Sequence, residues 1–324
     1  MIRVLFTDTH FGTHSNSAPW LNSQIDFIYK QLIPHLKQLR QKDSDIRLIH
    51  LGDVFDSRST LSTLVATQVV KAFKDLRECV SKFVIIGGNH DYYSPDTDEI
   101  DSLNLVLRDA SIELYTTEIG IDGEDLYVPW YKWIEQDELK SLVASGKYGS
   151  IFTHTDIIHE KIDPIFANTR IYSGHVHIPD LRPFRFNLGS CYALDFADHD
   201  AQRGYYIVED DNKMSFVPNQ HCIRFWRLYN EDLLDEQKMA SISSRDYVEV
   251  YVKQTNLVNE EYLEKIDQIN KSVKNRLVIP QIESTQINEE FESIDSYDIT
   301  SICRKAVPED LRDKFEQIIG SLSE

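Results

Sequence analysis

The sequence contains no long hydrophobic run. No apolar stretch in its 324 residues approaches the roughly 20 residues that a membrane-spanning helix needs. No leader with a basic start and an apolar middle opens the chain, and its first residues, MIRVLFTDTH, already have the pattern of a β-strand. We therefore expect a cytoplasmic protein that has no membrane as a partner.

Cysteine is also scarce, and the few cysteines lie far apart. The four residues, Cys79, Cys191, Cys222 and Cys303, form no CxxC pair. Disulfide scaffolds and zinc–thiolate sites both depend on cysteines at short, regular spacings. The spacing argues against both kinds of site and predicts reduced thiols, as in a cytosolic protein.

Basic residues are outnumbered by acidic ones. The chain has 34 Lys and Arg against 53 Asp and Glu, a formal net charge of −19 that is not confined to a tail. Acidic surfaces repel phosphate groups, so such a chain is a poor generic binder of nucleic acid. If it acts on DNA, bound cations and local Arg and Lys side chains must supply the positive charge.

The first two-thirds of the chain alternate short apolar runs with helical patterns. The apolar fraction of 41% is that of an ordinary globular protein. Ser23 and Thr60 are the expected N-caps of the first two helices. The order of elements predicts a layered α/β domain with helices on the sheet faces. These elements are strand 2–7, helix 23–42, strand 47–53, helix 60–77 and strand 82–91.

More strands than helices are predicted after these elements. VEDDNKM is a hairpin turn signal between the last two strands of this group, so the later part of the sheet is expected to be mixed or antiparallel. The strands lie near 112–115, 126–129, 149–153, 169–173, 184–188, 204–209 and 213–217.

The last third of the chain predicts a small second domain and a tail. A strand at 245–253, a helix at 259–275 and a strand at 276–282 would form a β-α-β unit. The acidic segment 283–298 is typical of a linker. Residues 307–322 have the pattern of an amphipathic helix, which either docks on its own domain or binds a partner.

Polar side chains that can bind metal stand where predicted strands end. In an open α/β sheet, the carboxyl ends of the strands form the crevice in which ligands bind. Taken singly, each residue has an ordinary explanation, such as turn chemistry for the Asp in DTH. Together and in this order they favour one common site. They are Asp8, His10, Asp53, Asn89, His90, His154, His175 and His177.

The types of these side chains indicate a metal site. Carboxylate, imidazole and amide oxygen without thiolate suit divalent ions such as Mn²⁺, Fe²⁺ or Zn²⁺. One carboxylate can bridge two ions, and ions roughly 3.5–4 Å apart can share a water, lower its pKa and prepare it to attack phosphorus. A histidine that binds no metal can protonate the leaving oxygen. In SGHVH, we expect His175 and His177 to bind one ion each.

The chain resembles the calcineurin-like metallophosphoesterase superfamily. The pattern of that superfamily, D-x-H…G-D…G-N-H-[DE]…H…G-H-x-H, is matched over residues 8–177. The resemblance implies a two-sheet α/β sandwich with helices outside. The matching blocks are Asp8-Thr9-His10, Gly52-Asp53, Gly88-Asn89-His90-Asp91, His154 and Gly174-His175-Val176-His177.

The resemblance also implies a role for each matching residue. His90 would bind no metal and would contact the phosphate or protonate the leaving group, and Asp91 would orient His90. Asp53 would bridge two metal ions. The other ligands would be Asp8, His10 and His177 for the first ion, and Asn89, His154 and His175 for the second.

Two stretches carry a closer resemblance to DNA-repair nucleases of the SbcD type, which include phage recombination nucleases. DTHFGT and GDVFDSR are similar to their D-x-H-[LF]-G and G-D-[IVL]-F-D segments. Cys191, in FNLGSCYALD, stands where these nucleases usually have proline. The resemblance implies a Mn²⁺-dependent DNA exonuclease and endonuclease that acts in double-strand-break repair or recombination. It also implies an SbcC-like ATPase of the structural-maintenance-of-chromosomes type as partner, and a homodimer formed through helices near residues 60–110.

This resemblance divides the chain into a nuclease domain at 1–222, a small α+β capping domain at 223–285, and a linker with a partner-binding helix at 286–324. Two other functions stay open. A small-molecule or nucleotide phosphodiesterase would need no second domain, and a non-catalytic scaffold would be expected to lack ligands.

Several basic residues could flank the cleft and bind phosphate, although each of them also fits an ordinary surface role. They are Arg58, Lys132, Arg182, Arg185 and Arg203.

Overall fold

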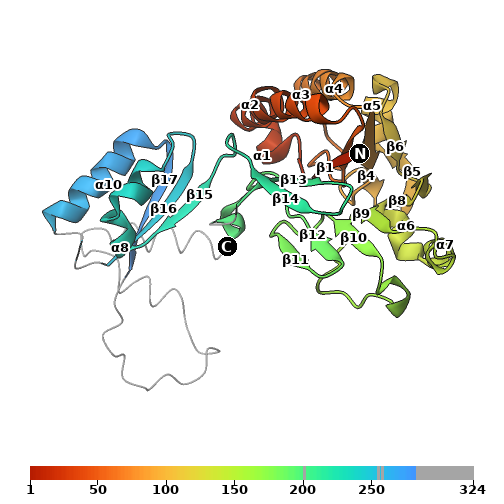
Figure 1. Cartoon of the computed structure of the whole chain (residues 1–324). Coiled ribbons are helices and arrows are strands. Elements are labelled where there is room, and N and C mark those ends of the chain that lie inside the picture. Colours follow the sequence, from red (N-terminus) through yellow and green to blue (C-terminus); the bar gives the residue numbers. More distant parts are fainter. Residues whose placement is uncertain (200–201, 254–255, 257–258, 282–324) are drawn as a thin grey trace, which may run out of the picture. The chain divides into compact units, whose positions relative to one another are not determined.

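The computed structural model describes residues 1–199, 202–253, 256 and 259–281, which are coloured in Figure 1. Met1–Gln281 form one compact unit. The predicted linker at 283–298 and the predicted helix at 307–322 lie outside the described residues. Among the residues that are described, no helix combines the length and the apolar character needed to cross a membrane.

Two six-stranded sheets build the larger part of this unit. The first has the order β14 (Met214–Pro218), β13 (Gly204–Val208), β1 (Ile2–Phe6), β2 (Ile46–His50), β3 (Lys82–Ile86) and β6 (Glu113–Tyr115). In it β1, β2, β3 and β6 are parallel, and the β13–β14 hairpin is added antiparallel, as the turn signal predicts.

The second sheet is also mixed. Its order is β11 (Asp180–Arg182), β12 (Arg185–Asn187), β10 (Arg170–Ser173), β9 (Ser150–Thr153), β8 (Asp125–Val128) and β7 (Gly120–Asp122). The four inner strands are parallel, and the two edge strands are antiparallel to their neighbours. The predicted mixed character of the later strands is therefore confirmed.

Side-chain alternation along the strands separates the apolar layers. In β1, Val4 and Phe6 pack with the helices, whereas Leu5 packs between the two sheets. In β9, Phe152 packs between the sheets and Ile151 packs on the outer side. Because successive residues of a strand point to opposite faces, each sheet buries one face against the other sheet and one face under helices.

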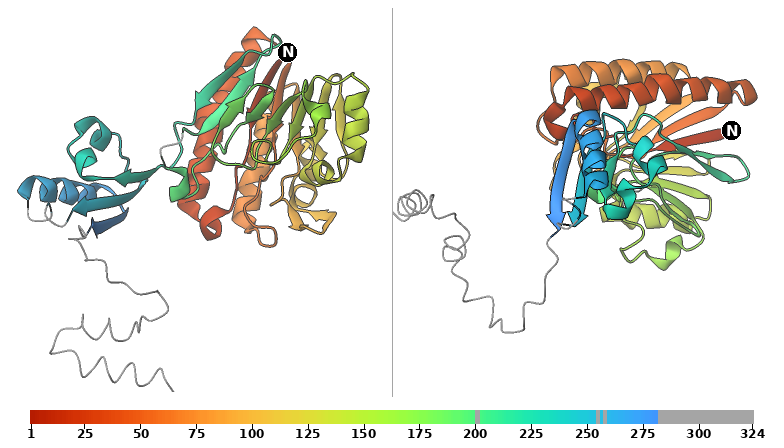
Figure 2. Two further views of the ribbon diagram at one scale, coloured as in Figure 1. Left: turned by 90° about the horizontal axis from the view of Figure 1, so that it is seen from below. Right: turned by 90° about the vertical axis from the view of Figure 1, so that its left-hand side faces the viewer.

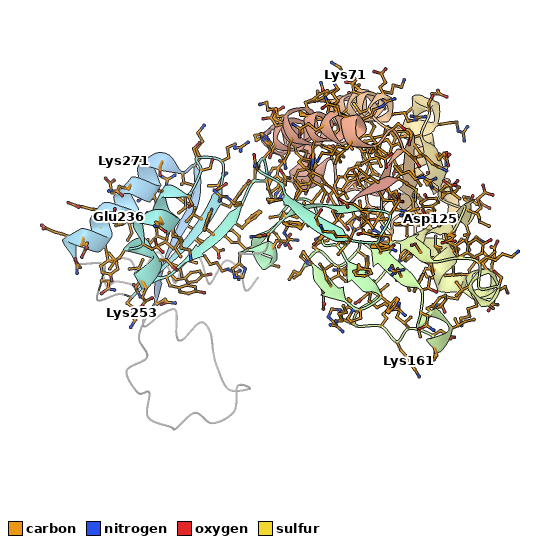
Figure 3. All side chains as sticks on the ribbon, in the orientation of Figure 1. Lys71, Asp125, Lys161, Glu236, Lys253 and Lys271 are labelled. Carbon is orange, nitrogen blue, oxygen red and sulfur yellow. The ribbon has the colours of Figure 1, made fainter. Side chains whose placement is uncertain are left out.

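Helices cover the outer faces of both sheets (Figure 2). Lys71, in the helix at Thr63–Glu78, points away from the sheet (Figure 3), and Val69 and Phe73 are buried on the opposite side. The predicted two-sheet sandwich with helices outside is therefore confirmed. The first sheet carries α2 (Ala18–Phe27), η1 (Ile28–Leu32), α3 (Ile33–Lys42), α4 (Thr63–Glu78) and α5 (Ser102–Leu107), and the second carries α6 (Trp130–Glu135) and α7 (Asp137–Ala144).

Several short elements lie in the connections. They are α1 (Thr13–Asn16), β4 (Tyr92–Ser94), β5 (Thr97–Asp101), η2 (Arg108–Ala110), η3 (Pro164–Phe166) and η4 (Phe196–Asp198). The strands β4 and β5 pair with each other as an antiparallel two-stranded sheet.

Both predicted N-caps are wrong. The helix predicted from residue 23 begins at Ala18, because Pro19 is pre-organised for a first helical turn, and Ser23 is buried inside the helix. In α4 the side chain of Ser62, not Thr60, caps the N-terminus. Ser and Thr have similar capping preferences, so the loop that leads into the helix decides which of them acts as the cap.

A third sheet consists of three parallel strands and has its own apolar core. Phe225, the first residue of its strand β15, belongs instead to the core of the first sheet, where it stacks on Trp20 with ring centroids 5.9 Å apart. The predicted strand, helix and strand at 245–282 are present, and β15 adds a strand that the sequence pattern does not predict. The domain boundaries at 222 and 285 stay a prediction. The elements are β15 (Phe225–Leu228), α8 (Asn230–Leu233), α9 (Glu236–Ala240), β16 (Tyr247–Lys253), α10 (Glu260–Ser272) and β17 (Asn275–Gln281).

Candidate metal centre

The predicted metal ligands all lie in loops that follow parallel strands. The loops come from both large sheets, after β1, β2 and β3 of the first and after β9 and β10 of the second. Figure 1 shows that these strands belong to neighbouring layers, so their carboxyl ends can meet at one edge of the sandwich. The distances between the side chains show how far they converge.

One group of ligand atoms gathers around Asp8. Oδ1 of Asp8 lies 3.8 Å from Nε2 of His10 and 3.7 Å from Nε2 of His177. One ligand atom from each of these three residues lies within 4.8 Å of the others. The loop of Asp8 and His10 thus meets His177, from a loop far later in the sequence, with ligand atoms close enough to share one metal ion.

A second group shares Asp8 and adds Asp53 and His154, again with ligand atoms within 4.8 Å of one another. Oδ2 of Asp53 lies 3.2 Å from Nε2 of His154 and 3.7 Å from Nε2 of His10. The Asp53 carboxylate therefore reaches a histidine of each group. This position is the one that a bridging carboxylate needs.

Asn89 joins the second group through its side-chain oxygen. Oδ1 of Asn89 lies 3.1 Å from Nε2 of His154 and 2.9 Å from Nδ1 of His175. The rings of His154 and His175 have centroids 5.3 Å apart. All seven residues predicted as metal ligands are thus linked by short distances, and the role of each as a ligand stays a prediction.

The ring nitrogens of two histidines provide a test of whether metal ions fit here. Both ring nitrogens of His10 are buried and have no hydrogen-bond partner within the described part of the chain, which is costly unless a ligand satisfies them. Nδ1 of His154 lies 2.7 Å from the carbonyl oxygen of Leu51, which leaves Nε2 for a metal. These nitrogen and oxygen donors fit a pair of divalent ions.

Backbone strain is concentrated in the same loops. The φ angles are 52° at Asp8, 42° at His10, 55° at Asp53 and 78° at His175. Residues other than glycine rarely adopt this left-handed region, and they keep it where the surrounding structure compels them, often at functional sites. The strain turns these side chains toward the centre, where a regular strand would alternate them between two faces.

Two glycines of the matching blocks allow the loops to pack this closely. A Cβ atom on Gly88 would lie 2.3 Å from the backbone nitrogen of Asp53, and one on Gly174 would lie 2.1 Å from Oγ1 of Thr7. Neither neighbour is the end of a long flexible side chain. The glycines therefore serve close packing around the centre.

The sequence matches the family model described as calcineurin-like phosphoesterase over residues 3–179. The chain belongs to this family. A calcineurin-like phosphoesterase is a metal-dependent hydrolase, and the groups around Asp8 are candidate sites for its divalent metal ions. A comparison with curated proteins gives no match.

Two solved structures show distant similarity to this calcineurin-like phosphoesterase. The nuclease MPE of Pseudomonas putida has 14% sequence identity and a TM-score of 0.31, and the match covers 66% of this chain and 87% of that one. A protein of unknown function from Aquifex aeolicus has 16% identity and a TM-score of 0.24, with 48% and 81% covered. At TM-scores this low, we draw nothing about the present chain from either structure.

Opposite charges perturb the pKa values in the metal-free phosphoesterase. Burial lowers the pKa of His10, but the carboxylates of Asp56, Asp8 and Asp53 outweigh it and raise this pKa to about 10. Burial likewise lowers the pKa of His154, while Asp53 and Asp8 raise it to about 9. The histidines in turn hold the pKa of Asp8 and Asp53 below the usual range against the effect of burial.

His90 lies beside the ligands and is held by a backbone group. Its Nδ1 is 2.7 Å from the carbonyl oxygen of Asp56, and its ring centroid is 5.0 Å from that of His10. Its own backbone N–H donates to Oδ1 of Asp53 at 2.8 Å. A fixed Nδ1 leaves Nε2 as the ring atom that can exchange a proton with a substrate.

Asp91 has a different role from the predicted one. Its carboxylate accepts hydrogen bonds from the backbone N–H groups of Gly88 and Asp53, both at 2.9 Å, and from the next two residues of the same loop. Burial and the charge of Asp53 raise the pKa of Asp91 to about 7. The prediction that Asp91 orients the ring of His90 is wrong, because the carbonyl of Asp56 holds that ring and Asp91 organises the loop of Asp53.

Asp56 is a residue of the centre that the sequence analysis did not select. Besides its carbonyl contact with His90, its Oδ1 lies 3.5 Å from Nδ1 of His10. The residue is the last one of the GDVFD stretch, so its position in a matching block was a usable signal. Its carboxylate can orient the ring of a metal ligand from behind.

Proposed function

We propose that this phosphoesterase is a DNA nuclease of the SbcD type that cleaves phosphodiester bonds as exonuclease and endonuclease in double-strand-break repair or recombination. The observation that carries the proposal is the convergence of seven side chains with oxygen or nitrogen donors, the candidate metal ligands, beside one further histidine, His90. The resemblance of DTHFGT and GDVFDSR to SbcD-type nucleases supports DNA as the substrate.

In this proposal the loops would hold two divalent ions, Mn²⁺ in the active enzyme. When bound, they would act as Lewis acids on the phosphate and acidify a water. The chain's contribution is to hold buried carboxylates and correctly oriented rings in place before substrate arrives. Asp53 would bridge the ions, Asp8, His10 and His177 would hold the first, and Asn89, His154 and His175 would hold the second.

His90 is the proposed proton donor to the leaving oxygen. Nδ1–H of His90 donates a hydrogen bond to the carbonyl oxygen of Asp56. The proton on Nε2 is therefore the one that His90 would give to the leaving oxygen. After cleavage the leaving hydroxyl carries this proton, and solvent restores it to Nε2. The backbone N–H of His90 donates a hydrogen bond to Oδ1 of Asp53. This hydrogen bond helps to hold His90 in one place beside the candidate metal ligands.

The basic residues expected near the cleft are largely engaged by protein groups. Arg203 is buried and pairs with Asp198 at 2.8 Å. Arg182 and Lys132 pair with neighbouring carboxylates, and Arg185 donates to backbone carbonyls. This observation favours a second candidate, a phosphodiesterase for small molecules or nucleotides, which needs no extended cationic surface.

A cleavage assay with two substrates separates these candidates. Purified enzyme is incubated with linear duplex DNA or with bis(p-nitrophenyl) phosphate, in Mn²⁺ or in Mg²⁺. We expect cleavage of both substrates with Mn²⁺, and loss of both activities in Asp53→Asn. Cleavage of the small substrate alone would support the second candidate. Failure to cleave either substrate, with Mn²⁺ binding demonstrated, would support a non-catalytic scaffold.

We further propose two protein partners. The first is an SbcC-like ATPase, which would bring DNA to an acidic nuclease that has little affinity of its own. The second is another copy of this chain, bound through the surface of α4 and α5, where Leu64 is 51% and Leu105 is 84% exposed. These two exposed leucines make the surface of α4 and α5 the one on which to test the homodimer.

A further inference from the structure

His50 is a buried histidine behind the metal centre, at the end of β2 and three residues before Asp53. It has no exposed surface, and both of its ring nitrogens have polar contacts. Nδ1 lies 3.2 Å from the backbone nitrogen of Gly52, and Nε2 lies 3.0 Å from Oγ1 of Thr9. The ring thus contacts Gly52, in the loop after β2, and Thr9, in the loop after β1.

The directions of these hydrogen bonds follow from the donors. The backbone N–H of Gly52 can only donate, so Nδ1 of His50 must accept and carry no proton. Nε2–H then donates to Oγ1 of Thr9, and the hydroxyl of Thr9 donates to the carbonyl of Val54 at 3.1 Å. Burial lowers the pKa of His50 to about 3, which agrees with a neutral ring.

This chain of hydrogen bonds connects two of the loops that carry proposed ligands. Thr9 stands between Asp8 and His10, while Gly52 and Val54 flank Asp53. The backbones of the two loops are also paired. The N–H of Asp8 donates to the backbone carbonyl of Gly52, and the N–H of His10 donates to the backbone carbonyl of Asp53, both at 3.1 Å. The ring of His50 adds a side-chain connection to this pairing from the buried side.

We propose that His50 is a positioning residue of the metal centre, whose neutral ring sets the separation of the Asp8–His10 loop from the Asp53 loop. The inference rests on the proposed two-metal function. It gives a role to a histidine whose position in RLIHLGD has no ligand pattern. Groups that orient metal ligands from outside the coordination sphere typically change metal affinity about 10- to 100-fold when removed.

Packing is the alternative explanation for His50. Its ring lies edge-on to Phe6 with centroids 4.5 Å apart and lies near Phe73 at 6.3 Å. Two variants separate the explanations. His50→Phe keeps an aromatic ring of similar size and loses both hydrogen bonds, whereas His50→Gln keeps an acceptor and a donor and loses the ring. If the hydrogen bonds matter, the Gln variant retains function, and if packing alone matters, the Phe variant does.

The experiment measures binding of Mn²⁺ to metal-free full-length protein by isothermal titration calorimetry, together with kcat and KM on bis(p-nitrophenyl) phosphate. We expect His50→Phe to weaken Mn²⁺ binding about 10- to 100-fold and His50→Gln to bind close to the wild-type level. His35→Phe is the matched control, because Nδ1 of His35 bonds the hydroxyl of Tyr205 at 2.5 Å away from the centre. It should leave Mn²⁺ binding unchanged.

Thr9→Val interrupts the same hydrogen-bond chain from its other end and covers the case in which His50→Phe does not fold. It should weaken Mn²⁺ binding as His50→Phe does, and the double variant should lose little more than either single one, because both changes break one connection. Wild-type affinity in His50→Phe or Thr9→Val, or equal losses in the Phe and Gln variants, would overturn the inference. Wild-type protein that binds no Mn²⁺ would instead refute the proposed function.

Discussion

At the scale of single residues, the histidines of the centre differ in what their ring nitrogens contact. The ring of His154 is fixed by the carbonyl of Leu51 and faces Asp53 through Nε2. The ring of His90 is fixed by Asp56 and lies beside His10. The same residue type therefore serves two proposed purposes, metal binding and proton transfer, and the backbone carbonyl behind each ring decides which nitrogen is free.

If His90 transfers a proton and binds no metal, its replacement should slow catalysis and leave metal affinity unchanged. Replacement by Asn should lower kcat by about 10²- to 10⁴-fold, the usual contribution of a general acid. Calorimetric Mn²⁺ affinity should stay at the wild-type level, because no ligand is lost. Wild-type cleavage of DNA by this variant would remove His90 from the mechanism.

The pKa values predict how pH affects the stability of the metal-free protein. His10 and His154 have folded-state pKa values of about 10 and about 9, above the ordinary value of 6.5. Their contribution to the free energy of unfolding is therefore complete below pH 6.5 and is lost as pH rises through about 9 to 10. Thermal unfolding in EDTA should show Tm falling over this range.

The control for this pH dependence is His10→Asn, which removes one of the two raised pKa values. Its Tm should fall less steeply between pH 6.5 and 10 than that of the wild type. Metal binding requires neutral rings, so Mn²⁺ affinity should rise over the same range. An identical slope of Tm against pH in variant and wild type would show that His10 does not titrate as described.

At the scale of elements, a buried ion pair helps to connect the two sheets at their shared interface. Arg3 of β1 donates two hydrogen bonds to Asp125 of β8, at 2.9 and 3.0 Å, and both residues are buried. Asp125 can be located in Figure 3, where it is labelled. Because a buried charge without its partner is costly, the pair sets which residues of the two sheets face each other.

Removal of one partner of this pair should destabilise the sandwich. Arg3→Met would take both hydrogen bonds from the buried Asp125 carboxylate and leave only the more distant Arg47, at 3.8 Å, as its counter-charge. It should cost about 3 kcal/mol in the free energy of unfolding, measured with urea. The double variant Arg3→Met with Asp125→Leu should recover much of this loss. Lys140→Met, which removes a more exposed pair with Asp163 at 3.0 Å, is the control and should cost far less.

At the scale of the whole molecule, the proposed homodimer predicts a dependence of oligomeric state on the α4–α5 surface. Leu105→Glu places a charge on the most exposed apolar side chain of that surface and should yield a monomer by light scattering after size-exclusion chromatography. Ile134→Glu, on α6 and 59% exposed, is the matched control. A monomeric wild type would refute the homodimer.

Much of the fold could be predicted from the sequence because its signals are local. The strands of the first sheet and the four inner strands of the second follow short apolar runs, and the β13–β14 hairpin follows a turn signal. The edge strands β7 and β11 are short and were not predicted. Helix starts were harder, since Pro19 in the first turn of α2 and the cap Ser62 of α4 follow loops whose course depends on the packed structure. The strand β15 was missed because Phe225 belongs to a core formed with Trp20, about 200 positions earlier in the chain.

The sequence by itself determined the chemistry of the candidate site: which carboxylates, rings and amide follow which strands, and the family whose pattern they match. Only the tertiary structure decided how these groups meet. It places Asp56 behind His10, turns Asp91 toward the Asp53 loop and puts His50 between two loops. The reason is physical, since ligand types are properties of single residues, whereas hydrogen bonds between distant loops exist only after the sheets have packed.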